Sequence, residues 1–131
     1  MHTTTKSPAE MRLTMPAEWE KQESILLAWP WNKEDWPGKF EPVPWVYAEI
    51  IRNIAATQKV RLIVRDGKMQ SAARKILSRV GANLKHVLFH QIPTDRVWMR
   101  DSGPIIVRSG KERIALNWRF NAWAKYPNHT L

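Results

Sequence analysis

The sequence predicts an α/β fold, and two alternating patterns carry this prediction. Short apolar runs rich in Ile, Val and Leu recur between segments whose apolar residues are spaced three and four apart. The first pattern is typical of buried strands and the second of amphipathic helices. Strands that alternate with helices favour crossover units in which helices cover a sheet. Two last strands around a Ser-Gly-Lys turn predict a hairpin, which would make that sheet mixed.

The first half of the chain predicts two strands and a helix. Residues 24–29 (SILLAW) form an apolar run that stops at Pro30, as expected of a strand followed by a loop. Helical spacing begins at Val43, and the prolines at 42 and 44 suit a first helical turn. Residues 59–65 (KVRLIVR) are rich in β-branched and aliphatic side chains and end at an Asp-Gly pair, so they predict the second strand.

The second half repeats the alternation and then departs from it. Residues 69–80 have helical spacing, and Gly81 suits the end of that helix. Residues 86–92 (HVLFHQI) predict a third strand. Residues 104–108 and 112–118 predict the two strands of the hairpin. No linker divides the chain into two domains.

Composition indicates a soluble, globular, cytoplasmic protein. Of the 131 residues, 44% are hydrophobic and 25% charged, and no apolar run approaches the about 20 residues of a spanning helix. Residues 1–14 lack the apolar segment of a signal peptide, so they read as a polar lead-in and not as a signal peptide. This lead-in need not be ordered. The chain has no cysteine, which excludes disulfides and a thiol nucleophile within it.

The net charge keeps a binding function in view. The formal charge is +9, which would attract nucleic acid or anionic surfaces non-specifically. The charges are dispersed, and no run of five or more Lys and Arg appears. His86 and His90 lie four apart in a strand-like run without a completing Glu, so they do not predict a metal site. A basic binding module without catalytic activity therefore remains as an alternative hypothesis.

One loop carries candidate chemistry. Residues 94–104 (TDRVWMRDSGP) follow a predicted strand and hold Trp98 three residues before Asp101. A carboxylate beside an indole is a suitable receptor for a planar cation, since the acid accepts the N–H donors and the ring packs on the flat face. In the alternative interpretation, Arg96 or Arg100 neutralises Asp101 at the surface and Trp98 fills the core.

Three motifs together resemble a known family. Residues 15–32 (MPAEWEKQESILLAWPWN), 97–104 (VWMRDSGP) and 117–126 (NWRFNAWAKY) resemble, in this order and at similar separations, the opening of the agmatine deiminase and bacterial, Porphyromonas-type peptidylarginine deiminase family. The resemblance implies a propeller of about five α/β modules around a pseudo-fivefold axis, the fold of guanidino-group-modifying enzymes. Residues 15–131 would supply its first one or two modules, an incomplete N-terminal portion of one catalytic domain.

The resemblance also implies a reaction. In this family a cysteine thiolate attacks the guanidinium carbon, a histidine carries protons, and two acids hold the guanidinium nitrogens. Ammonia leaves, and water releases the product. The histidine, second acid and cysteine lie beyond the matched region, so we expect the 131-residue chain alone to be inactive. No cofactor or metal is implied.

Three residues match the family's site positions. Asp101 matches the first acid that grips the guanidinium, Trp98 matches an aromatic wall, and Trp123 lines the same cavity. Arg100 would repel a cationic substrate and is expected to pair with Asp95 or Glu18 instead.

The expected substrate is a small guanidino compound. For agmatine the products are N-carbamoylputrescine and ammonia, a step of putrescine and polyamine biosynthesis. Departures at Lys21-Gln22, Asn117 and residues 121–125 leave open an arginine or peptidyl-arginine deiminase. No specific nucleic acid and no membrane is expected as a partner, and a homo-oligomer stays open.

Overall fold

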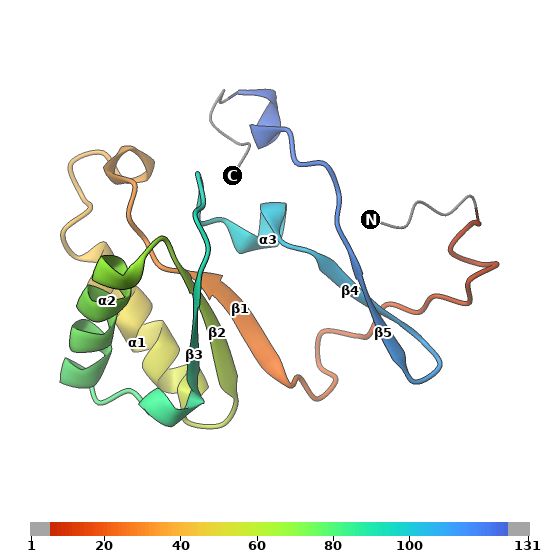
Figure 1. Cartoon of the computed structure of the whole chain (residues 1–131), viewed down its shortest axis with the longest axis horizontal. Coiled ribbons are helices and arrows are strands. Elements are labelled where there is room, and N and C mark those ends of the chain that lie inside the picture. The colour runs from red at the N-terminus through yellow and green to blue at the C-terminus, as the bar shows by residue number, and fades with distance from the viewer. Residues whose placement is uncertain (1–5, 126–131) are drawn as a thin grey trace.

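The computed structural model describes residues 6–125, and its elements follow the predicted order (Figure 1). The strands are β1 (Ser24–Ala28), β2 (Lys59–Val64), β3 (Val87–Gln91), β4 (Ile105–Ser109) and β5 (Glu112–Leu116). The helices are α1 (Val43–Ala55), α2 (Gly67–Arg79) and the single turn α3 (Met99–Ser102). Short 3-10 turns are η1 (Lys33–Asp35), η2 (Leu84–His86) and η3 (Ala122–Ala124).

A parallel sheet in the order β1-β2-β3 is the centre of the fold. Its register pairs Ile25 with Val60, and Val60 with Val87. Strand β2 lies in the middle and is buried more completely than its neighbours. Because parallel strands need crossover connections, α1 and α2 link successive strands and pack on one face of the sheet. The predicted crossover units are therefore confirmed.

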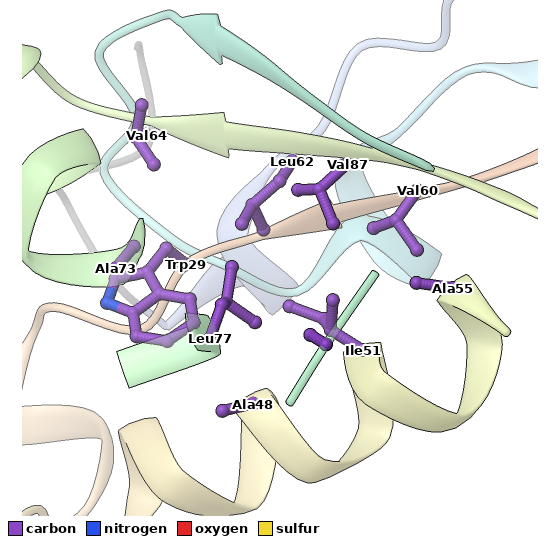
Figure 2. Close-up of a cluster of buried hydrophobic side chains, with 11 residues drawn as sticks. Trp29, Ala48, Ile51, Ala55, Val60, Leu62, Val64, Ala73, Leu77 and Val87 are labelled. Carbon is purple, nitrogen blue, oxygen red and sulfur yellow. The ribbon is translucent and has the colours of Figure 1, made fainter. Parts of the chain in front are cut away.

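The main core lies between this face and the two helices (Figure 2). Alternate residues of β2 point toward the helices, as the period of two requires. Full burial of each large aliphatic side chain contributes about 1.5–3 kcal/mol relative to exposure. The buried members of this core are Trp29, Ala48, Ile51, Ala55, Val60, Leu62, Val64, Ala73, Leu77, Ala82 and Val87.

Local chemistry sets the ends of α2. The Asp66 side chain accepts a hydrogen bond of 2.7 Å from the Met69 N–H, so the predicted Asp-Gly turn is also the N-cap of this helix. Gly81 follows the helix with a φ of +72°, a left-handed conformation that glycine adopts without steric cost.

The hairpin forms a sheet of its own, so the single mixed sheet that we expected is wrong. Strands β4 and β5 pair antiparallel with each other and not with the parallel sheet. The chain from Ile92 to Pro104 leaves the parallel sheet before β4 begins, and Thr14 forms a bridge with Arg108 on β4. The hairpin therefore contacts the amino-terminal segment instead of the parallel sheet (Figure 1).

Within residues 6–125, no helix has the length and apolarity that crossing a bilayer requires.

Candidate functional site

The loop that carries the candidate residues crosses the second face of the parallel sheet. Val97 is buried there, and it forms a small apolar cluster with Ala28 and Ile63. Met99, at the start of α3, packs against the same cluster. These contacts anchor the loop on the sheet.

A buried ion pair ties this loop to η1. Arg96 Nη1 lies 2.6 Å from Asp35 Oδ1, and each side chain is only 6% exposed. Buried charges persist only when they are paired, because transfer of an isolated charge out of water costs several kcal/mol. Arg96 and Asp35 are 61 residues apart in sequence, so this contact exists only in the folded chain.

An aromatic cluster is centred on Trp36, the residue that follows Asp35. The Trp98 ring lies 5.4 Å from the Trp36 ring, centroid to centroid, at an interplanar angle of 42°. Trp36 also contacts Phe40 and Tyr47. Burial raises the pKa of the Tyr47 hydroxyl, and the nearby Asp35 charge raises it further. The surroundings of Trp98 are therefore apolar and partly shielded from water.

A groove of about 460 Å³ opens beside Trp98. Trp98 and Trp123 both line this groove. Asp101 does not line this groove; it lies one helical turn further on, in α3. The groove is lined by Glu34, Asp35, Pro37, Trp98, Trp123 and Lys125.

Asp101 is exposed, and its carboxylate is not engaged. Among residues 6–125 it forms no ion pair or side-chain hydrogen bond, although its backbone N–H donates to the Trp98 carbonyl. Arg96 pairs with Asp35, and Arg100 lies 3.6 Å from Glu18 in an exposed pair. The interpretation in which Arg96 or Arg100 neutralises Asp101 is therefore wrong, and of the two expected partners Arg100 takes Glu18.

Glycine is required where α3 ends. A Cβ atom on Gly103 would lie 2.5 Å from the Met99 carbonyl oxygen, closer than real Cβ contacts. The Gly103 N–H donates to that same carbonyl, which closes the turn. The Ser102 hydroxyl also donates to the Trp98 carbonyl at 3.0 Å. The motif residues after Asp101 thus fix the turn from which Asp101 and Trp98 project.

Three charged groove residues were missed by the sequence analysis. Glu34 and Asp35 lie in a Trp- and Pro-rich segment that reads as an ordinary loop, and Lys125 follows the last matched tryptophan. A local signal existed only for Asp35, a carboxylate that directly precedes a tryptophan, Trp36. Its partner Arg96 gives no such signal.

Comparison with known proteins identifies the family. Residues 14–131 match the Porphyromonas-type peptidyl-arginine deiminase family. A protein of Yersinia pestis named "Putative agmatine deiminase" is 33% identical over 118 residues, which cover 89% of this chain and 30% of that protein. A protein of the same name from Selenomonas ruminantium is 36% identical over 110 residues, covering 83% of this chain and 29% of the relative.

The solved structures agree with the sequence match. A variant of C. jejuni agmatine deiminase with substrate bound superposes with a TM-score of 0.73 at 27% identity, over 89% of this chain and 33% of that one. The chain thus spans about 30% of the length of the relatives it matches. It belongs to the Porphyromonas-type peptidyl-arginine deiminase family.

Proposed function

We propose that Asp101 and Trp98 form the part of a guanidinium-binding site that this chain contributes to an agmatine deiminase-type hydrolase. The observation that carries the proposal is the Asp101 carboxylate, which stays exposed while the arginines on either side are paired elsewhere. A guanidinium remains protonated and presents a planar fork of N–H donors, so it requires an acceptor of negative charge. Trp98 supplies the ring on which its flat face can pack.

The rest of the reaction requires groups from outside these residues. A deiminase of this type needs a thiolate that attacks the guanidinium carbon, and the chain has no cysteine. We propose that residues 15–131 are the N-terminal portion of one catalytic domain, built as a propeller of α/β modules. The purified 131-residue chain should then release no ammonia from agmatine or arginine.

The charged residues of the groove are compatible with two substrates, which differ at the end opposite the guanidinium group. Agmatine ends in an ammonium group, for which Glu34 is a suitable partner, and this agrees with the names of the relatives. Arginine carries a carboxylate as well, and Lys125 on the same groove is the group that would favour it. Agmatine is the first candidate and arginine, free or peptidyl, the second. Trp123 lines the same groove and would contact the tail.

The decisive experiment is Asp101→Asn in a complete enzyme that carries this sequence. The amide keeps the shape of the side chain and loses its charge, so kcat/KM should fall by about 30-fold to several thousand-fold, as for one member of a buried charge pair. The thermal midpoint should hardly change, since Asp101 has no partner among the described residues. A near-normal kcat/KM would remove Asp101 from the site. Glu34→Gln removes the proposed partner of the agmatine ammonium group and should lower kcat/KM for agmatine more than for arginine.

A further inference from the structure

We propose that the buried Asp35–Arg96 ion pair is a positioning device that holds the Trp98 ring in the wall of the groove. The inference rests on the proposed function, in which Trp98 packs on the face of the guanidinium. Neither Asp35 nor Arg96 is assigned a contact with the reacting atoms. They act through Trp98.

The ion pair and the ring contact lie next to each other along both segments. Trp36 follows Asp35 directly, and Trp98 follows Arg96 after one residue. The two charged groups are 2.6 Å apart and the two ring centroids 5.4 Å apart. A shift of either segment that broke the ion pair would therefore also separate the rings.

Backbone hydrogen bonds hold both ends of the loop that carries Trp98. The Ile92 N–H donates to the Val64 carbonyl at the end of the parallel sheet, and the Met99 N–H donates to Val97 where α3 begins. Between these points the Arg96 side chain crosses to η1 and Val97 enters the core. Val97 fixes the height of the loop above the sheet, and the ion pair fixes its lateral position against Trp36.

Because the ion pair is buried, it favours a single relative position of η1 and the loop that carries Trp98. If Trp98 moves away, Arg96 and Asp35 separate in a site where each is 6% exposed and where water cannot replace the lost partner. An exposed pair such as Arg100–Glu18 lacks this property, because water solvates its separated charges. A neutral substitution at Arg96 or Asp35 should therefore free the ring even when the fold persists.

The ring pair gives a direct spectroscopic test in the 131-residue chain. Trp36 and Trp98 are the tryptophans whose rings are in mutual contact within residues 6–125, and coupled indoles give an exciton couplet in far-ultraviolet circular dichroism. Trp36→Phe assigns the couplet, since it should abolish the signal. We expect Arg96→Gln and Asp35→Asn to lose the couplet as well. Arg96→Lys keeps the charge and should recover part of it.

Binding of agmatine to a complete enzyme that carries this sequence, followed by tryptophan fluorescence, is the second measurement. Misplacement of a positioned group by about 1 Å can cost up to 100-fold, so Arg96→Gln should weaken agmatine binding by about tenfold or more. Leu77→Ala is the matched control, because it removes core packing far from the groove. Measured below its thermal midpoint, this control should keep both the couplet and the wild-type affinity.

The outcomes separate the two proposals. An Arg96→Gln chain that keeps the couplet, or a Leu77→Ala chain that loses it equally, would overturn the positioning role. Loss of the couplet in Arg96→Gln, together with no agmatine binding by the wild-type form of a complete enzyme that carries this sequence, would uphold the positioning of the ring and count against the proposed function. Loss of both signals in Arg96→Gln alone supports both.

Discussion

The crossover unit, residues 24–91, and the hairpin unit, residues 6–23 with 105–116, are stabilised in different ways. The crossover unit encloses a continuous apolar core between the parallel sheet and two helices. In the hairpin, Val107 is the one buried residue of β4 and β5. The hairpin is attached to the amino-terminal segment mainly through polar contacts. These are the bridge between Arg108 and Thr14, a hydrogen bond from the Ser109 hydroxyl to the Met11 carbonyl, and ion pairs of Arg108 with Glu20 and of Arg113 with Glu23.

The residues that stabilise the fold and the candidate functional residues therefore lie in different parts of the molecule. The candidate residues Trp98, Asp101 and Trp123 lie outside the crossover unit, either in the loop and α3 that connect the two units or beyond β5. The crossover unit contributes a rigid sheet face on which that loop rests. Functional groups carried on loops over a packed scaffold are common in α/β proteins. Substitutions should therefore fall into two groups, one that affects unfolding and one that affects binding.

The largest expected effect is in the crossover core. Leu77→Ala should lower the free energy of unfolding by about 2–5 kcal/mol, because Leu77 is fully buried and its loss leaves a cavity between α2 and the sheet. Urea titration followed by circular dichroism measures this. Val107→Ala in the hairpin is the comparison and should cost less. Equal costs would show that the two units share one cooperative core.

Gly103→Ala should have a smaller effect that is confined to the connection between the units. The added Cβ would lie 2.5 Å from a backbone oxygen that has no freedom to withdraw, so overpacking should cost about 1–3 kcal/mol. Thermal unfolding measures the cost, and Pro104→Ala at the exposed neighbouring position serves as a control. A neutral Gly103→Ala would show that α3 can open without consequence.

Asp101→Asn should hardly change stability. Its carboxylate is exposed and has no partner within the described residues, so the free energy of unfolding should stay within about 0.5 kcal/mol of wild type. Denaturant titration of the 131-residue chain checks this directly. A loss above about 1 kcal/mol would mean that Asp101 has a structural role, and any effect on binding would then need a different explanation.

The smallest effect should be the pH dependence of the hairpin's attachment. The Arg113 hydrogen bond holds the pKa of Glu23 below its ordinary 4.5, so this contact is present above that value. It is lost as the pH falls through the lowered pKa, and added salt should weaken it further. Nuclear magnetic resonance of β5 amides between neutral and acidic pH detects the release. Glu23→Gln is the control and should remove the part of the dependence that comes from Glu23, while the Arg108–Glu20 pair, whose carboxyl also has a lowered pKa, retains the rest and the crossover unit remains unchanged.

Prediction from sequence succeeded where the signal is local. The strands at 24–28, 59–64 and 87–91 and the helices between them follow from periodicity and from turn residues such as Gly81. Trp98 and Trp123 line the same groove, and their role in binding a substrate stays a prediction. The partner of Arg96 was missed, and so were Glu34 and Lys125 as groove residues, because their positions depend on contacts between distant segments.

By itself, the sequence determined the order of the elements and the family, and the receptor at Asp101 and Trp98 stays a prediction from it. Periodicity and turn chemistry act over a few residues, so a single chain is enough to reveal them. Only the tertiary structure decided that the hairpin forms its own sheet and that Arg96 pairs with Asp35. Sheet edges and buried ion pairs are chosen by the balance of burial against desolvation among residues far apart in sequence, and that balance exists only once the chain is folded.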